Sequence, residues 1–504
     1  MHLRPRRGEG WFEGGCAAGV ALLSLVVARI AFDGPSPSEV VADALIGIVP
    51  GALFSLILGQ LEFAAKPLLH VGIGIGAIGV GAIVGRMYVA CEASLVRLIG
   101  TIAVLIAVLW LAVLPMLGAG LLGLTRPASP PLWFSTGFGA VVLVVLVHSL
   151  TQRRADVRPD VVAPGRRRLV LTIGAVASMV ASWLLWRTLG QSQSASPVLG
   201  AATAADGDGH PTPEYTPVGV FYNVSKNMLD PRVDEDGWRL RIIGDVENEY
   251  ELTFAELKAL PSVEQPATLC CISNEVGGDL VGHAQWKGVR LRDLLERGGV
   301  KPDSIDVVFH CRDEYRDSIA LADALRPETI VVYEMNGAPL THKHGFPIRV
   351  IVPGIYGMKN AKWVDRIQVV DNDFKGFWQV QGWSDTAGHQ TMSRIDRPHA
   401  PRDRAQPGPR PIHGIAFGGD RGIARVEVSV DGGGTWFDAA LRPAAGPFSW
   451  VRWSASFTPE VDERRTLMVR ATDGSGRPQI DRYATPFPNG STGYHSIAVT
   501  FENG

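Results

Sequence analysis

Six apolar runs dominate the first 190 residues of this 504-residue chain. They cover about residues 15–33, 43–61, 67–90, 100–124, 131–150 and 169–189, and acidic side chains are scarce throughout this half. A run of about 20 apolar residues is long enough to cross a bilayer as a helix. The sequence therefore predicts an α-helical, polytopic transmembrane domain over residues 1–190 rather than a cleaved signal peptide.

The distribution of arginine sets the expected topology. The amino terminus and the loop 151–168 are both rich in arginine, which places both in the cytoplasm and requires an even number of crossings between them. The weakest run, 43–61, has Pro50 and Gly51 at its centre, and we interpret it as a re-entrant or interfacial segment. We therefore expect five crossings, with residue 191 onward outside; six crossings with a cytoplasmic enzyme half are the alternative.

A glycine pattern lies inside the third apolar run. Residues 74–79 match G-x-G-x-x-G, but a dinucleotide site would need a strand before the pattern and an acidic residue after it. Gly72 and Gly76, like Gly81 and Gly85, repeat at four-residue spacing, which favours close packing of membrane helices.

Two histidines, His70 and His148, are the candidates for holding a haem in the membrane half. The two runs that carry them cross in the same direction, and His70 begins its run whereas His148 nearly ends its own. One haem cannot bridge opposite leaflets, and no C-x-x-C-H motif is present. We expect neither haem nor an iron–sulfur cluster.

The soluble half follows a polar, flexible linker at residues 191–213. Within it, residues 268–274 read Thr-Leu-Cys-Cys-Ile-Ser-Asn, where a strand-like run enters a glycine-rich turn. A cysteine in this setting can be a thiolate ligand for a soft metal, a nucleophile or a small buried apolar residue.

Motifs on both sides of the cysteine pair occur in a specific order and spacing. They are Trp238 to Leu240, Leu252 to Leu257, Trp286 to Leu295, Tyr333 to Gly337, His344 to Arg349, Val352 to Gly354, and Lys362 with Trp363. Over residues 212–400 the chain thereby resembles the sulfite oxidase family of molybdopterin-dependent oxidoreductases, in a membrane-anchored bacterial form. The resemblance implies an α+β molybdopterin-binding catalytic domain, which we place at residues 214–400.

The resemblance also implies the residues of the site. Cys271 and Asn274 match the family's C-x-x-N setting, so Cys271 is expected to be the catalytic residue and the molybdenum ligand, a role that suits a soft thiolate donor. Turn amides near residues 277 and 278 would support the thiolate, and an entry strand at 216–223 would meet the pterin. The expected cofactor-binding residues are Phe221, Tyr222, Asn223, Asn274, Asp313, Ser318, His344, Arg349, Asn360, Ala361 and Lys362.

Two positions depart from the animal members of the family. Glu275 stands where those enzymes carry an arginine that binds sulfite, and Phe374 stands where they carry an active-site tyrosine. An acidic residue repels a dianion, so the sequence argues against sulfite as the substrate while leaving the cofactor unaffected. Separately, Cys270 and Cys311 can pair as a disulfide outside the cytoplasm, or both can be buried free thiols.

Residues 404–504 have the pattern of an all-β domain. Residues 424–430 alternate apolar and polar side chains, and Asp431 to Thr435 form a hairpin-type turn. Further strands are expected at 448–457, 466–472 and 495–501, which together favour an immunoglobulin-like sandwich. It is similar to the family's dimerisation domain; a rigid cap on the catalytic domain is the alternative.

The sequence thus predicts an integral membrane protein whose catalytic domain lies outside the cytoplasm. We expect a molybdopterin-dependent oxidoreductase that transfers an oxygen atom on a small sulfur- or nitrogen-containing substrate, exchanges electrons with a separate partner and can form a homodimer. The alternatives are an S-oxide reductase of the methionine-sulfoxide type, a cofactor-free extracytoplasmic binding protein and a regulated transporter. A net charge of −2 gives no electrostatic case for nucleic acid.

Overall fold

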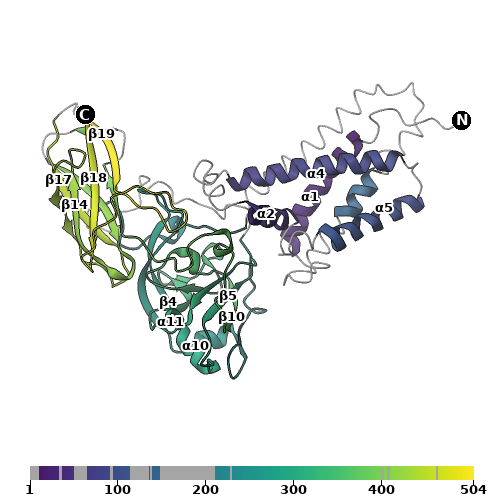
Figure 1. Cartoon of the computed structure of the whole chain (residues 1–504), viewed down its shortest axis with the longest axis horizontal. Helices are drawn as coiled ribbons and strands as arrows, with labels where there is room; N and C mark the ends of the chain where they lie inside the picture. Colours follow the sequence, from purple (N-terminus) through teal and green to yellow (C-terminus); the bar gives the residue numbers. More distant parts are fainter. Residues whose placement is uncertain are drawn as a thin grey trace. The chain divides into compact units, whose positions relative to one another are not determined.

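The computed structural model of the chain describes residues 11–32, 37–49, 65–90, 95–113, 136, 139–147, 210–227, 230–398, 402–405, 409–460 and 464–503. The chain divides into two compact units, one of Met1–Ser192 with Asn227–Pro231 and one of Gln193–Lys226 with Arg232–Gly504 (Figure 1).

The part of the first unit described between residues 11 and 147 is helical apart from a bend at residue 49. Its helices are α1 (Trp11–Phe32), α2 (Pro37–Ile48), α4 (Ala65–Ala90) and α5 (Leu95–Val108), which continues into a π-helical turn (Leu109–Val113), and residues 139–147 are also helical. Among these helices, one is long and apolar enough to cross a membrane, over Leu68–Tyr88.

Several expectations for the membrane half fall on other residues. The loop 151–168, the run 169–189, His148 and most of the run 43–61 lie outside the described residues, as does the linker up to residue 209. The number of crossings therefore stays a prediction.

Helix packing in this unit uses one of the two predicted glycine pairs. A Cβ added at Gly81 would overlap Ala18 of α1, and a Cβ added at Gly14 would lie 2.9 Å from the Cα of Gly85. By contrast, a Cβ at Gly76 would meet no described residue within 4 Å, and the same holds at residue 72. Among the described residues, close packing of α1 on α4 is thus confirmed at the carboxyl-terminal pair of glycines.

The second unit begins with one mixed sheet and one antiparallel sheet. The first has the order β2-β1-β10-β5-β6, with β1 parallel to β10 and the other pairs antiparallel. The second has the order β3-β4-β7-β8, and β9 also pairs with β7. The strands are β1 (Arg239–Gly244), β2 (Tyr250–Thr253), β3 (Val263–Cys270), β4 (Val281–Arg290), β5 (Asp306–Cys311), β6 (Arg316–Ala320), β7 (Ile330–Met335), β8 (Ala338–Pro339), β9 (Arg349–Ile351) and β10 (Val364–Val370).

Short helices connect these strands, and their ends follow local sequence. The helix α9 (Phe254–Ala259) follows Thr253, whose hydroxyl accepts from the Glu256 amide, as a threonine just before a helical run predicts. The helix α10 (Leu291–Gly298) ends where Gly299 takes a left-handed conformation, which glycine adopts readily at the end of a helix. The remaining helix is α11 (Leu321–Ala324).

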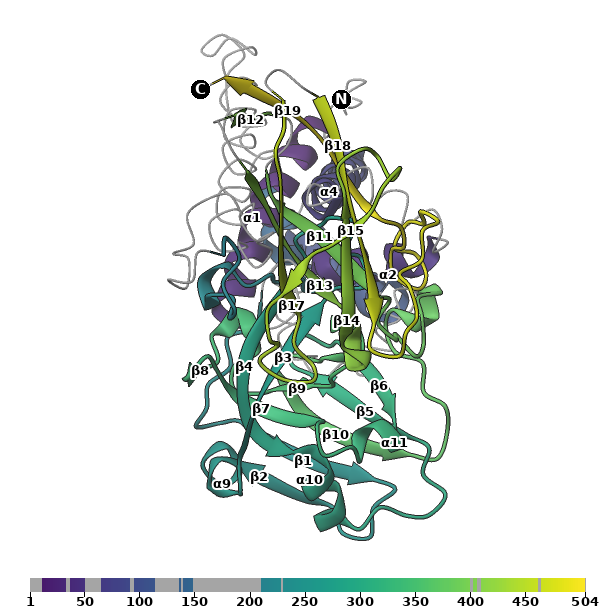
Figure 2. The same ribbon diagram turned by 90° about the vertical axis from the view of Figure 1, so that its left-hand side faces the viewer.

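The carboxyl-terminal part forms a β-sandwich (Figure 2). One sheet has the order β11-β13-β17-β16 and the other β12-β19-β18-β14-β15. Its strands are β11 (Met392–Arg397), β12 (Arg402–Ala405), β13 (Arg410–Phe417), β14 (Ile423–Ser429), β15 (Phe437–Asp438), β16 (Ala440–Leu441), β17 (Val451–Phe457), β18 (Arg464–Asp473) and β19 (His495–Asn503). The alternation in β14 buries Val426 and Val428 in the core between the sheets, as expected. Because β11 pairs with β13, the sandwich begins before residue 404.

An entry segment, which we define as residues 210–223, leads into the catalytic domain. The expected entry strand at 216–223 is wrong: the segment contains a single 3₁₀ turn at Val218–Val220. The reason lies in its hydrogen bonds, because the amides of residues 220 and 221 both donate to the Pro217 carbonyl and close a turn instead of joining a neighbouring strand. The amide of Thr216 does reach the carbonyl of His283 in β4, at 2.7 Å.

Candidate active site

The adjacent cysteines at the end of β3 face opposite sides, because side chains alternate along an extended chain. Cys271 packs in the cluster that contains Tyr222, and its Sγ lies 3.0 Å from the hydroxyl of Ser273. Cys270 packs in a different cluster, which contains Phe417 of the sandwich. Of the two thiols, only Cys271 therefore lies on the side of the expected cofactor-binding residues.

The other soluble cysteines are free thiols. Cys270 and Cys311 form no disulfide, so of the two alternatives left open by the sequence the buried thiols are confirmed. Burial raises the pKa of both thiols. Neither is thereby suited to act as a thiolate without a bound metal.

The turn from Cys271 to Leu280 is closed by hydrogen bonds at its base. The Cys271 amide donates to the Leu280 carbonyl (2.9 Å), and the Leu280 amide donates back to Oδ1 of Asn274 (2.8 Å). The Asn274 side chain also bonds the Cys270 thiol. Asn274, expected as a cofactor-binding residue, thus uses its side chain to shape the turn.

Arg349 is the most unusual charge of the site. It is 6% exposed, and its Nη1 and Nη2 donate to the carbonyls of His344 (3.4 Å) and Asn360 (3.2 Å). Its Nε has no partner, and no carboxylate pairs with it among the described residues. Burial lowers the pKa of Arg349 to about 10, and the neighbouring Tyr222 partly offsets this shift.

His344 and Lys362 lie beside this arginine. The imidazole of His344 is 3% exposed, with Nε2 3.0 Å from the carbonyl of Val218 in the entry segment. Burial lowers the pKa of His344 to about 4, and the positive charges of Arg349 and Lys362 lower it further. Lys362 donates from Nζ to Oδ1 of Asn223 at 2.5 Å.

The aromatic residues of the entry segment lie on the Cys271 side of the turn. Phe221 stacks on Tyr222 with ring centroids 5.4 Å apart, and it meets His344 and Trp286 edge to face at 5.6 and 5.8 Å. Burial raises the pKa of Tyr222, and the nearby Cys271 contributes to the same shift. Phe221 fills the core here, so it would meet a cofactor mainly through its backbone.

In the loop between β9 and β10, the Asn360 side chain bonds to backbone groups of the loop itself, so the loop would contact a cofactor mainly through its backbone. The Oδ1 of Asn360 accepts from the Val352 amide (2.7 Å), and its Nδ2 donates to the Tyr356 carbonyl (3.1 Å). The carbonyl of Ala361 accepts from the Val350 amide (2.8 Å). The expected roles of Asn360 and Ala361 thus rest on how they hold the loop.

The structure places Asp313 and Ser318 in a second polar group. Oδ1 of Asp313 accepts from the Tyr315 amide (3.1 Å). The Ser318 hydroxyl donates to the carbonyl of Phe374 (2.9 Å), whose amide donates to Asp306 (3.0 Å). Ser318 therefore ties the Phe374 segment to β6, and its side chain is already committed.

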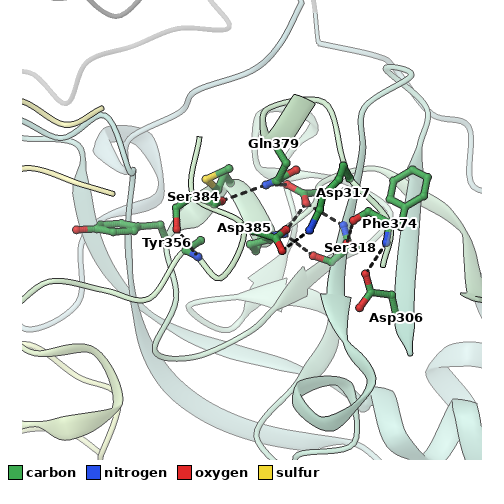
Figure 3. Close-up of polar contacts among 12 residues, drawn as sticks. Asp306, Asp317, Ser318, Tyr356, Phe374, Gln379, Ser384 and Asp385 are labelled. Carbon is green, nitrogen blue, oxygen red and sulfur yellow. Dashed lines mark hydrogen bonds and ion pairs between the residues drawn. The ribbon is translucent and has the colours of Figure 1, made fainter. Parts of the chain in front are cut away.

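A buried ion pair at the centre of this second group was missed by sequence reasoning. Lys359 Nζ lies 3.0 Å from Oδ1 of Asp317, and the two side chains are 3% and 0% exposed. Figure 3 shows Gln379 between Asp317 and Ser384, and its Nε2 donates to the Asp317 carboxylate and to the Ser384 carbonyl (both 3.5 Å). Asp385 lies 3.8 Å from Lys359 Nζ. Nothing in the sequence pairs residues 317 and 359, because the contact forms only when the loop 357–359 folds over β6.

The two positions that depart from the animal enzymes are also placed. Glu275 is exposed in the turn after Cys271, where it accepts a hydrogen bond from the Tyr483 phenol. Phe374 is half-buried beside the second polar group.

Comparisons with known proteins agree with this geometry. A family model described as the oxidoreductase molybdopterin binding domain matches residues 227–378, and one described as the Mo-co oxidoreductase dimerisation domain matches residues 365–486. The sulfite oxidase of Gallus gallus is 31% identical over 322 residues, which cover 53% of this chain and 69% of that protein. The chain belongs to the sulfite oxidase family of molybdopterin-dependent oxidoreductases.

Two further relatives and one solved structure extend the comparison. The mitochondrial sulfite oxidase of Drosophila melanogaster is 33% identical over 325 residues, 53% of this chain, and the match spans only 56% of that relative. The uncharacterized oxidoreductase YuiH of Bacillus subtilis is 34% identical over 150 residues, which cover 30% of this chain and 74% of that protein. The crystal structure of the sulfane dehydrogenase SoxCD from Paracoccus pantotrophus shares the fold, with a TM-score of 0.52 and 23% identity over 60% of this chain and 85% of that one.

Replacing His344 by glutamine should make the free energy of unfolding less dependent on pH in the acidic range. The pKa of His344 is about 4 in the folded state against about 6.5 unfolded, so the folded state binds fewer protons and stability is lost as pH falls through this window. The dependence of unfolding free energy on pH should become shallower by up to ~1.4 kcal/mol per pH unit. Urea unfolding of the cofactor-free protein between about pH 4.5 and 7.5 measures it.

The matched control is His342→Gln. His342 is exposed two residues earlier, so its variant should keep the wild-type response to acid. A His344→Gln variant with the wild-type response would contradict the neutral, buried state of His344.

Proposed function

We propose that this chain is a molybdopterin-dependent oxidoreductase that transfers an oxygen atom on a small sulfur compound. The observation that carries the proposal is the combination of Cys271 on the cofactor side of its turn with a buried arginine, Arg349, that has no carboxylate partner among the described residues. A binding protein without a cofactor would leave this positive charge uncompensated.

The residues fit the cofactor of the family. A buried guanidinium without a counter-charge is costly, and an anionic phosphate would satisfy the free Nε of Arg349 and balance its charge. Lys362 adds a second cation, while neutral His344 can donate or accept one hydrogen bond.

Each residue then has a role that follows from its contacts. When bound, the cofactor supplies a molybdenum centre that exchanges an oxygen atom and electrons with the substrate. Cys271 would give its thiolate to the metal, and Asn274 fixes the turn that carries this thiolate. The Arg349 guanidinium lies over the ring of Trp286, against which Phe221 packs edge to face, and this packing excludes water from the charge.

The substrate we propose is a sulfur compound of low negative charge. Glu275 places a carboxylate in the turn after Cys271, and Phe374 brings no hydroxyl. Both features disfavour a dianion such as sulfite. The same site can act in the reverse direction, as an S-oxide reductase.

Membrane attachment and partners belong to the same proposal. The apolar helix over Leu68–Tyr88 supports membrane attachment. The arginine-rich amino terminus and loop 151–168 support a catalytic half outside the cytoplasm. The match to a dimerisation domain supports a homodimer. Electrons would pass to a separate carrier.

Replacing Arg349 by methionine should remove most of the molybdenum and pterin from the purified full-length chain. Losing a charge-assisted contact to a phosphate costs about 1.5–3 kcal/mol, which corresponds to roughly a tenfold or larger loss of affinity. Molybdenum analysis and pterin fluorescence measure the cofactor content. The control is Arg312→Met, because Arg312 is 46% exposed and pairs with Asp365. A wild type without molybdenum, produced in a host that makes the cofactor, would overturn the proposed function.

Replacing Glu275 by arginine should raise turnover of sulfite. Reversing the charge in the turn after Cys271 changes repulsion of the dianion into attraction, so kcat/KM for sulfite should rise by about tenfold or more at low salt and less at high salt. Stopped-flow assays with an artificial electron acceptor measure this, alongside a neutral thioether whose turnover should change little. The control is Glu251→Arg, an exposed site on β2. Equal sulfite activity in the wild type and in Glu275→Arg would contradict the substrate class.

A further inference from the structure

The β-sandwich contacts the turn after Cys271 at several of its residues. Ser491 donates to the Asn274 carbonyl (2.7 Å), and Arg394 donates from Nη1 to the Gly278 carbonyl (2.8 Å). Between these two points, Gly277 lies against the ring of His495, so close that a Cβ there would overlap the imidazole. The sandwich also supplies Tyr483, the hydrogen-bond partner of Glu275.

Arg394 is the most constrained of these contacts. Its side chain is 3% exposed in β11, and its Nε lies 2.6 Å from Oδ1 of Asp396. The other oxygen of Asp396 accepts from the hydroxyl of Thr212 in the entry segment, at 2.5 Å. A single buried ion pair thus joins the sandwich, the entry segment and the turn, and the planar guanidinium fixes the direction of its bond to Gly278.

The position of Gly278 affects Cys271 through the backbone of the turn. Gly278 precedes Leu280 by two residues, and Leu280 exchanges hydrogen bonds with Cys271 and Asn274 at the base of the turn. Displacing the Gly278 carbonyl would therefore displace the partner of the Cys271 amide.

The sandwich also contacts the strand on the other side of Cys271. The amide of Thr268 in β3 donates to the Phe448 carbonyl (2.9 Å), and the Trp450 amide donates to the Thr268 hydroxyl (2.8 Å). Cys271 therefore lies between two segments that both bond to the sandwich.

We propose that Arg394 is a positioning residue for the Cys271 thiolate, and that the sandwich completes the active site of its own chain in addition to any part in dimerisation. The inference rests on the proposed function in that Cys271 is the metal ligand. Its structural part, the fixing of the turn by Arg394, is tested without the cofactor.

Hydrogen exchange of the cofactor-free full-length chain tests the structural part. Arg394→Met should speed exchange by about tenfold in the peptide that covers residues 272–281, because a lost charge-assisted bond makes local opening of the turn easier. The control is Arg421→Met. Arg421 lies in the same sandwich and pairs with Asp473 (2.7 Å), and its Nη2 donates to the His389 carbonyl (2.9 Å). This variant should leave peptide 272–281 at the wild-type rate.

A milder variant covers the case in which Arg394→Met does not fold. Ser491→Ala removes only the bond to the Asn274 carbonyl, and it should speed exchange in the same peptide by a smaller factor. The proposal is overturned if the folded variant leaves residues 272–281 at the wild-type rate, or if Arg421→Met speeds their exchange equally.

The loaded enzyme gives a second readout. In Arg394→Met the Mo(V) electron paramagnetic resonance spectrum should shift from that of the wild type. Arg394→Lys keeps the charge, so its spectrum should lie between those of Arg394→Met and the wild type. An unshifted spectrum in Arg394→Met would overturn the positioning role. A wild type without molybdenum would instead refute the proposed function. The hydrogen-exchange result would then decide by itself whether Arg394 fixes the turn.

Discussion

A buried positive charge without a negative partner is the constraint from which the rest of the site can be understood. Taking a guanidinium out of water costs several kcal/mol unless charge and hydrogen bonds compensate it. Arg349 has only carbonyl partners and a free Nε among the described residues. The fold keeps this charge beside His344 and Lys362 and places Cys271 on the same side of the sheet end. The uncompensated positive charge would be balanced by an anionic group, and the family's cofactor carries such a group.

The catalytic domain does not hold its key cysteine alone. Strand β3 before Cys271 and the turn after it both bond to the sandwich, through Thr268 on one side and Gly278 on the other. The entry segment reaches the same ion pair through Thr212 and continues to the aromatic residues near Cys271. Three segments that are distant in sequence therefore meet around one short turn, so the position of Cys271 depends on how the domains pack.

The sequence predicts those structural features that depend on residues close together in the chain. The Thr253 cap and the alternation of Val426 and Val428 each depend on residues only a few positions apart. The choice of Cys271 over Cys270 came from a family motif, and the structure adds that the two thiols face opposite sides. The entry strand failed because a backbone turn at Pro217 competes with pairing to the sheet.

Contacts between distant segments could not be read from the sequence. The pair of Asp317 with Lys359 and the bond of Arg394 to Gly278 arise only from tertiary packing. Asn274 and Ser318 were expected to meet the cofactor, yet their side chains bond to the protein itself. A motif therefore indicates which residues a family requires, whereas the structure shows whether each acts through its side chain or by holding the backbone.

The most direct test of this account is X-ray absorption spectroscopy at the molybdenum edge of the purified full-length protein, compared with Cys271→Ser and Cys270→Ser. The account predicts one fewer sulfur ligand to molybdenum in Cys271→Ser and an unchanged sulfur shell in Cys270→Ser. An unchanged shell in Cys271→Ser, or a lost sulfur in Cys270→Ser, would contradict it.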